Sequence, residues 1–368
     1  MPSSIAIEFD DATHILIRGR RLLYFAGCDY LRLSGHPAVH KAICAAMHHR
    51  PFGTGASRTT TGEHAAYGQA ERAIAGFMRQ PAAIMVAAGY LAPIAAFQAL
   101  KSFTTHILLA DAAHACVADG ATLSGLPVQR FSYADVAALG KALRRLPRSA
   151  RPVIACDGLQ GARGRIAPLA AYLAELPSRG WLLVDDAHGF GTIGPSGRGT
   201  VAARGLDDDR IIQTISLGKS LGMQGGAIVG SRSMIKAIYD SAPAFIGNTA
   251  PLLPIASGIT AAVKLLAGNP GRVERLQSNA RLIHALLPQA EHIFHDLESP
   301  VLVIYPRDVA SARRLRSMLQ RAGIFPSWIT YLNSPPQGIF RFALSSSHTA
   351  RDVRQLAAVI VEWEKGQA

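Results

Sequence analysis

Two short apolar runs in this chain each lead to residue types that can do chemistry. Residues 181–184 are followed by Asp185 and His188, and residues 211–215 lead to Lys219. Short apolar runs that end in charged residues are typical of buried parallel strands, and open α/β sheets bind their ligands at the carboxyl ends of such strands. We therefore expect Asp185 and Lys219 to lie at the same crevice.

The chemistry that would use these groups together is carbonyl chemistry. A lysine beside a carboxylate and an imidazole can form a Schiff base. Pyridoxal 5′-phosphate is a carbonyl cofactor whose ring nitrogen also needs an acid. An ordinary salt bridge between Asp185 and Lys219 is the alternative, because strand ends often carry charges. The two segments taken together favour the cofactor site.

Two more segments could complete such a site. Gly89 and Tyr90 follow an apolar strand and open a helix, so their backbone N–H groups could hold a phosphate. A plain turn is the alternative. His114 comes just after the strand that ends at Ala110, where its ring could lie over a planar cofactor. For a single histidine, a structural role in the core is the alternative.

A competing motif indicates a different class of protein. Gly218-Lys219-Ser220 resembles the end of a Walker A loop of nucleotide hydrolases. That loop also needs a glycine five positions before its last glycine, and this chain has Gln213 there. The Walker A interpretation is therefore excluded.

The composition is that of a globular protein. The chain has 368 residues, of which 49% are apolar and 17% charged, enough for a large core and two domains. No apolar run reaches the ~18 residues of a membrane span, and Met1 to Ser4 carry no charged-then-apolar signal, so we expect a cytoplasmic protein without a membrane span. The four cysteines show no spacing typical of a disulfide framework or a metal site.

The net charge of +13 favours an acidic partner. The arginines are scattered through helical patterns without interleaved aromatic residues, so we expect no nucleic-acid partner. Coenzyme A and acyl carrier proteins are both anionic, and a basic surface would steer either one towards the protein.

Strands and helices alternate through most of the chain, which predicts an α/β fold. A large, mostly parallel seven-stranded sheet is expected, with helices around it. The predicted strands are residues 83–86, 106–110, 128–131, 153–155, 181–184, 211–215 and 226–229.

The alternation of strands and helices is interrupted near residues 241–254 by prolines and a glycine. Longer helical patterns with few strands follow, which predicts a smaller α+β domain at the C-terminus. We therefore expect an N-terminal arm at residues 1–35, a large domain at 36–245 and a small domain with its connecting helix at 246–368.

The central motifs resemble those of the α-oxoamine synthases, which are fold-type I pyridoxal phosphate enzymes. The resemblance runs from about Tyr30 to the C-terminus. It is carried by Asp185-Asp186-Ala187-His188-Gly189-Phe190-Gly191, Gly194, Gly197-Arg198-Gly199 and Ser216-Leu217-Gly218-Lys219-Ser220-Leu221-Gly222.

This resemblance implies roles for four residues at the cofactor ring. Lys219 matches the Schiff-base lysine, and Asp185 matches the acid at the pyridine nitrogen. His188 matches the partner of the phenolic oxygen, and His114 matches the histidine stacked on the ring.

It also implies the contacts to phosphate and substrate. Gly89 and Tyr90 match the phosphate-binding turn, and Ser216 adds a hydroxyl near the same phosphate. Thr249 resembles the threonine that the family lends to the neighbouring subunit, which implies a homodimer with shared active sites. Arg341 matches the arginine that holds the substrate carboxylate, a task that suits a guanidinium.

Three positions depart from the family pattern. Cys28 replaces an amide expected near the substrate carboxylate. Gly161 stands where a serine often helps to bind the phenolic oxygen, and Tyr67 stands where histidine is common. Each departure weakens the transfer of a particular substrate from the family to this chain.

The implied activity is a decarboxylative condensation of a small amino acid with an acyl thioester, giving an α-amino ketone. We expect L-alanine and a pimeloyl thioester of coenzyme A or of a carrier protein, because the loop at residues 53–58 resembles that branch. The alternatives are a sister synthase that uses glycine or serine, an aminotransferase of the same fold and a non-catalytic partner subunit. The presence of Lys219, Asp185 and His114 argues against the last.

Overall fold

This computed structural model describes residues 6–49, 51–287, 293–294, 296–330 and 335–366. Residues 1–5, which bear on the expected absence of a targeting signal, lie outside the described part. The chain divides into two compact units. We call Leu33–Gln160 with Ile166–Pro270 the sheet unit, and Met1–Arg32 with Gly161–Arg165 and Gly271–Ala368 the terminal unit.

The sheet unit is built on one seven-stranded sheet with the strand order β4-β10-β9-β8-β7-β5-β6. β10 is antiparallel to both of its neighbours, and the other pairs are parallel. The predicted large, mostly parallel sheet is therefore confirmed. Its strands are β4 (Ala82–Val86), β5 (His106–Ala110), β6 (Val128–Phe131), β7 (Pro152–Asp157), β8 (Trp181–Asp185), β9 (Ile211–Ser216) and β10 (Gly226–Gly230).

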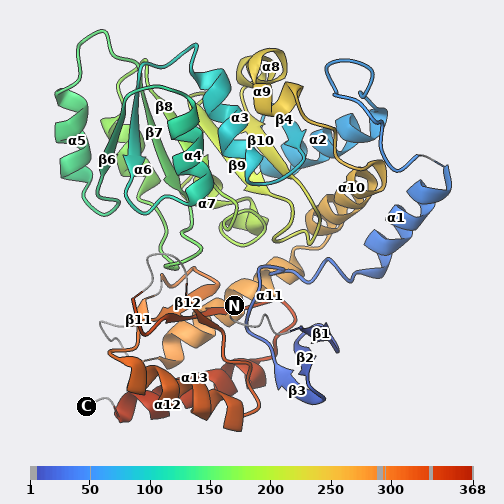
Figure 1. Cartoon of the computed structure of the whole chain (residues 1–368), viewed down its shortest axis with the longest axis vertical. Coiled ribbons are helices and arrows are strands. Elements are labelled where there is room, and N and C mark those ends of the chain that lie inside the picture. The colour runs from blue at the N-terminus through green and yellow to red at the C-terminus, as the bar shows by residue number, and fades with distance from the viewer. Residues whose placement is uncertain (1–5, 50, 288–292, 295, 331–334, 367–368) are drawn as a thin grey trace. The chain divides into compact units, whose positions relative to one another are not determined.

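Helices cover both faces of this sheet (Figure 1). The helices of the sheet unit are α1 (Pro37–His49), α2 (Ala65–Met78), α3 (Leu91–Leu100), α4 (Ala115–Leu123), α5 (Val136–Arg144), α6 (Leu169–Glu175), α7 (Thr200–Ala203), α8 (Arg232–Ser241), α9 (Pro243–Ile246) and α10 (Leu253–Gly268), of which α1 packs against α10. Successive side chains of a strand point to opposite faces, so Ile107 packs into the core with α3, α4 and α8, and Leu108 into the core with α5 and α6. Both faces are buried, which is why the strands read as nearly continuous apolar runs.

The helix α10 belongs to the sheet unit, although we expected residues from 246 onward in the smaller domain. It packs against α1 and α2, and buries Ile259, Ala262 and Val263. This apolar side of α10 keeps the segment with the large sheet. The observed units therefore differ from the division predicted at residues 35 and 245.

The terminal unit contains two antiparallel sheets, of which one joins β1 (Glu8–Phe9), β2 (His14–Ile17) and β3 (Arg20–Leu23). The other has the order β11-β12-β14-β13. Its strands are β11 (Ile293–Phe294), β12 (Val301–Ile304), β13 (Trp328–Ile329) and β14 (Ile339–Ala343), and the helices of the unit are α11 (Gly271–Leu286), α12 (Val309–Arg321) and α13 (Ala350–Lys365). β12 and β14 are buried throughout, and both α11 and α12 pack against α13.

Across the described residues, the structure contains no helix with the length and apolar character needed to cross a membrane. The expected cytoplasmic location stays a prediction.

Candidate active site

Asp185 is the last residue of β8, and three hydrogen bonds hold its buried carboxylate. Thr214 Oγ1 and the backbone N–H of Ala187 donate to Oδ1 at 3.1 and 3.2 Å, and Cys116 Sγ donates to Oδ2 at 3.4 Å. Thr214 is the register partner of Asp185 on β9. These donors fix the orientation of the carboxylate at the carboxyl edge of the sheet.

Asp186, the next residue, has different surroundings. Its fully buried carboxylate accepts hydrogen bonds from the backbone N–H and the hydroxyl of Thr200, both at 2.8 Å. A Cβ atom on Gly158, Gly189 or Gly199 would lie 2.7, 1.9 or 2.1 Å from an oxygen of this carboxylate. Burial raises the pKa of Asp186 to about 7. Asp186 therefore anchors the loops around it, whereas its neighbour Asp185 contacts Cys116.

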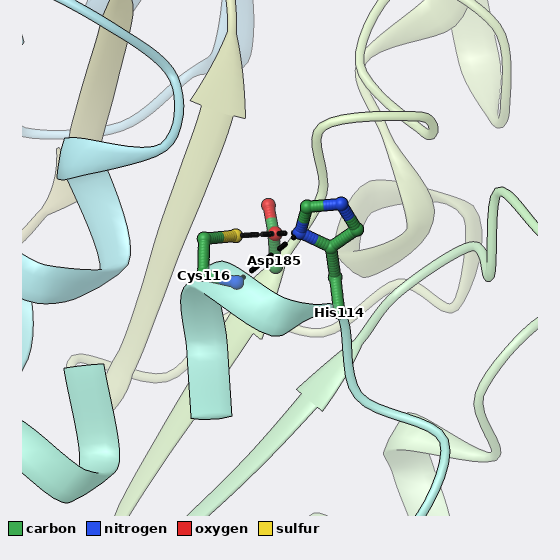
Figure 2. Close-up of side chains that lie close together, drawn as sticks. All are labelled: His114, Cys116 and Asp185. Carbon is green, nitrogen blue, oxygen red and sulfur yellow. Dashed lines mark hydrogen bonds between the residues drawn. The ribbon is translucent and has the colours of Figure 1, made fainter. Parts of the chain in front are cut away.

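His114 and Cys116 lie beside Asp185 at the start of α4 (Figure 2). His114 caps the helix, because its Nδ1 accepts the backbone N–H of Cys116 at 3.3 Å and also lies 2.9 Å from Cys116 Sγ. The backbone N–H of His114 in turn donates to Asp157 Oδ1 at 3.0 Å. A neutral ring that accepts at Nδ1 carries its proton on Nε2. The imidazole is thus held by one nitrogen only, while the residue itself remains exposed.

Burial favours the neutral forms of the imidazole and the thiol in this cluster. Partial burial lowers the pKa of His114, an effect that Asp185 opposes and the charge of Lys219 reinforces. Burial and the charge of Asp185 raise the pKa of the Cys116 thiol. His114, Cys116 and Asp185 also offer three ligand atoms within 4.8 Å of one another, so these side chains could hold a metal ion as well as an organic cofactor.

The turn between β4 and α3 runs directly against the two neighbouring strands. A Cβ atom on Gly89 would lie 2.9 Å from Ser216 Oγ, and one on Gly226 would lie 2.6 Å from the Cα of Gly89. Glycine is therefore required on both sides of this approach. Tyr90 precedes α3, its ring lies edge-on to that of His114 with centroids 6.2 Å apart, and its hydroxyl donates to Asp119. The turn thus combines a helix start with the Ser216 hydroxyl, as a phosphate site requires.

Lys219 lies half-buried in the loop between β9 and β10. The backbone N–H of Gly222 donates to its carbonyl oxygen at 2.9 Å, which closes a tight turn. Burial and the charge of Asp185 raise the pKa of Asp157, and the positive charge of Lys219 opposes that shift. The charge of Lys219 therefore acts on Asp157, on His114 and on Cys116, which belong to one group of side chains.

His188 and Thr249 also lie in the sheet unit. His188 follows β8, and its carbonyl oxygen accepts from Thr192 Oγ1 at 2.5 Å. Thr249 lines a small cavity together with Val86 and Ala87, the residues that lead into the Gly89 turn. The departure at Tyr67 lies near this segment, because its buried hydroxyl donates to the carbonyl of Pro251 at 2.6 Å.

Arg341 lies on β14 in the terminal unit, and its guanidinium is buried among neutral partners. Its Nε donates to the carbonyl of Gly161 at 2.5 Å, and Nη2 donates to Tyr30 Oη at 3.2 Å and to Cys28 Sγ at 3.7 Å. Two of the three departures from the family pattern, Cys28 and Gly161, therefore meet at this arginine. Burial raises the pKa of the Tyr30 phenol. A carboxylate ligand could supply the negative charge that these partners lack.

Three residues of the cluster were not identified as site residues from the sequence. Cys116 is buried, and it contacts both Asp185 and His114. Thr214 lies two residues before Ser216, so the strand period places both on one face of β9. Asp157 ends β7 and pairs with Asp185 in the sheet register. The strand-end position of Asp157 was a signal that could have identified it.

The arrangement fits pyridoxal phosphate. One buried carboxylate, Asp185, could hold a ring nitrogen, and an imidazole lies beside it. The space at Gly89 is a cradle that a Cβ atom would fill, next to a serine hydroxyl. Lys219 supplies an amine whose charge acts on the same cluster.

Comparison with known proteins agrees with this fit. The model of the family "Aminotransferase class I and II" matches residues 21–360. The 8-amino-7-oxononanoate synthase of Aromatoleum aromaticum is 32% identical over 96% of this chain and 92% of its own length. That of Polaromonas sp., named 8-amino-7-oxononanoate synthase 1, is 34% identical over 97% of this chain and 90% of its own length.

Solved structures confirm the fold-type I architecture. The serine palmitoyltransferase of Sphingomonas wittichii superimposes with a TM-score of 0.91 at 24% identity, covering 100% of this chain and 93% of that one. The 8-amino-7-oxononanoate synthase of Francisella tularensis has a TM-score of 0.79 at 26% identity, covering 94% of this chain and 98% of that one. The chain therefore belongs to the class I and II aminotransferase family and, within it, to the α-oxoamine synthases.

Proposed function

We propose that this protein is a pyridoxal phosphate-dependent 8-amino-7-oxononanoate synthase. In this reaction L-alanine condenses with a pimeloyl thioester, and carbon dioxide and the free thiol leave. The observation that carries the proposal is the placement of Asp185, His114 and the Gly89 turn in one unit of a chain whose curated relatives carry that name. When bound, the cofactor supplies a ring that withdraws electrons from the α-carbon of the amino acid.

Residues of the sheet unit would hold the cofactor. Asp185 would keep the pyridine nitrogen protonated, because the hydrogen bonds from Thr214 and Ala187 orient its carboxylate for that contact. His114 would lie over the ring, held in place through its Nδ1. His188 would contact the phenolic oxygen.

The phosphate would be bound by the backbone N–H groups of the Gly89-Tyr90 turn and by Ser216. A homodimer with shared sites would add Thr249 from the neighbouring subunit. Sedimentation of the holoenzyme tests the dimer, and mixing Thr249→Ala with Lys219→Ala tests the shared site, since one intact site per hybrid dimer should restore part of the activity.

Lys219 would hold the cofactor through its amine and, as a free amine, would accept the proton from the α-carbon of the amino acid. Only the neutral amine can accept that proton, so the positive charge must be lost before this step. Arg341 would bind the substrate carboxylate, which would give its buried guanidinium the negative partner that Gly161, Tyr30 and Cys28 do not provide.

The test supplies the loaded enzyme with L-alanine, glycine or L-serine and with pimeloyl, acetyl or palmitoyl thioesters, and identifies products by mass spectrometry. We expect 8-amino-7-oxononanoate from alanine and the pimeloyl thioester. Lys219→Ala should lower turnover by on the order of 10³-fold or more and remove the borohydride-reducible absorbance band. If that band persists in the purified variant, the role of Lys219 is wrong.

A sister synthase is the second candidate, and the surroundings of Arg341 favour it. Cys28 contributes a thiol where an amide was expected, and Gly161 offers only its backbone carbonyl. Product formation from glycine or serine, but not from alanine, would establish this alternative in the same assay.

A further inference from the structure

The terminal unit contains a cavity of about 560 Å³ that the proposed reaction does not use. Arg272 and Arg275 of α11 line it on one side. Ser346, Ser347 and Thr349, which lead from β14 into α13, line it on the other. A volume of several hundred Å³ is typical of sites for organic ligands rather than for single ions.

The cavity gathers positive charge. Arg272 and Arg275 are three positions apart on α11 and so share one side of the helix. Both guanidinium groups donate to neutral carbonyl oxygens, Arg272 Nη1 to that of Leu31 at 3.2 Å and Arg275 Nε to that of Ser346 at 3.4 Å. Burial and the charge of Arg275 lower the pKa of Arg272, and Asp29 opposes this shift only in part. An anion between the two guanidinium groups would relieve their repulsion.

The described residues that line the cavity include no acid, but Asp29 acts on Arg272 and Asp352 lies beside the lining residue Thr349. The Asp352 carboxylate accepts from the backbone N–H and the hydroxyl of Thr349, both at 2.8 Å, in a capping box at the start of α13. This carboxylate is engaged with the helix cap, so we assign anion binding to the arginines and serines and not to the helix end.

Ser346 independently indicates a missing ligand. The residue is only 2% exposed, and its Oγ has no hydrogen-bond partner among the described residues. The backbone fixes its position, because its N–H donates to the carbonyl of Tyr30 at 2.8 Å. A buried hydroxyl without a partner is unfavourable, and because Ser346 lines the cavity, rotation of its side chain would let an oxygen atom of a bound ligand satisfy it.

We propose that this cavity binds a phosphate group, held by Arg272, Arg275 and the hydroxyl of Ser346. Two guanidinium groups and a hydroxyl match the charge and the acceptor oxygens of phosphate. The size of the cavity favours a phosphate that is part of a larger organic molecule. We assign it to the phosphorylated thiol carrier of the acyl donor, and this choice of ligand rests on the proposed function.

The test uses the pyridoxal phosphate-loaded protein and measures binding by calorimetry at constant ionic strength, with coenzyme A and inorganic phosphate as probes. Arg272→Gln combined with Arg275→Gln should weaken coenzyme A binding about tenfold or more, since each lost bond involves a charged donor. Arg313→Gln combined with Lys141→Gln, at exposed positions on α12 and α5, is the control for loss of two positive charges and should leave binding unchanged. Equal weakening by the control would overturn the proposal.

Ser346→Ala separates ligand binding from folding. Because this change removes a hydroxyl without a partner, the melting temperature in phosphate-free buffer should equal or exceed that of the wild type. Coenzyme A should raise the melting temperature of the wild type more than that of the variant. An identical rise in both proteins would contradict the role of Ser346.

The outcomes also separate this inference from the proposed function. Normal ketone synthesis and an unchanged thioester KM in the arginine double variant would overturn the inference and leave the function intact. Phosphate binding that depends on these residues, in a protein that makes no ketone, would support the site and reject the function. Binding of inorganic phosphate without binding of coenzyme A would support a phosphate site, but it would overturn the assignment of its ligand to the thiol carrier.

Discussion

Asp185 and Asp186 are adjacent in the sequence, yet they lie in two regions with different tasks. The region of Asp185 contains an exposed imidazole, a thiol and a nearby amine charge. The region of Asp186 is closed, with Thr200 as the hydrogen-bond donor and glycines packed around the carboxylate. The end of β8 thus provides Asp185, which can bind a ligand, and Asp186, which anchors the surrounding loops.

Burial alone does not distinguish a catalytic carboxylate from a structural one in this protein. Asp186 is the more buried of the two, and burial raises its pKa to about 7. Its hydrogen bonds nevertheless stay within the protein framework. Asp185 is distinguished by its neighbours, since Cys116 connects it to His114.

The largest effect that separates the two regions is expected from Asp185→Asn. The amide can still accept from Thr214 and Ala187, but it cannot stabilise a positive charge on a ring nitrogen. We expect kcat/KM for ketone synthesis to fall by on the order of 10²- to 10⁴-fold, with little change in melting temperature. Equal activity of Asp185→Asn and the wild type would remove Asp185 from the cofactor site.

A smaller effect, on stability, is expected from Asp186→Ala. This change leaves the buried backbone N–H of Thr200 without its acceptor, which costs roughly 1–3 kcal/mol of unfolding free energy. Urea denaturation measures this loss. Activity per folded molecule, assayed well below the unfolding transition, should stay within about threefold of the wild type, because RT ln 3 is below the ~1 kcal/mol of a typical hydrogen bond. A large loss of turnover with intact stability would reverse the assignment of the two aspartates.

The contribution of Asp186 to stability should also depend on pH. Burial raises the pKa of Asp186 in the folded protein to about 7, above the 3.8 that is ordinary for an aspartate. The folded state therefore binds this proton more tightly than the unfolded state, so the contribution is fully present below about pH 4 and is lost as the pH rises towards 7. Asp186→Asn keeps the shape of the side chain and removes the titration. The unfolding free energy of the wild type relative to this variant should increase from pH 8 to pH 5, and a difference independent of pH would contradict the shift.

The sequence predicts the sheet well because burial on both faces leaves a clear local pattern. The predicted run 211–215 corresponds to β9 (Ile211–Ser216), and 181–184 corresponds to β8 (Trp181–Asp185). Apolar residues of strand length and charged strand ends are local properties, so a single chain displays them. The position of Asp185 at the carboxyl edge follows directly.

Contacts between segments that are far apart in the sequence leave no local pattern from which they could be predicted. The sequence pattern of α10 predicts an amphipathic helix but not the domain to which the helix belongs. Only its packing against α1 and α2 assigns it to the sheet unit. Cys116 likewise reads as a core residue, because its contact with Asp185 spans 69 positions of the chain. The family resemblance placed Cys28 and Arg341 near the same substrate carboxylate, but it gave no sign that the carbonyl of Gly161 accepts from Arg341, because Gly161 was expected near the phenolic oxygen.

The smallest expected effect tests whether Cys116 connects His114 to Asp185 or merely fills space between them. Cys116→Ala removes the donor to Asp185 and leaves His114 Nδ1 with only the backbone N–H at 3.3 Å. A lost hydrogen bond of about 1 kcal/mol corresponds to about fivefold weaker cofactor binding, measured by titrating apoprotein with pyridoxal phosphate. Cys116→Ser keeps a donor of similar size at the same position, so its affinity should lie between those of the alanine variant and the wild type. Equal affinities for all three proteins would mean that the thiol contributes packing alone, and the difference between the two aspartate regions would then rest on Lys219 and His114.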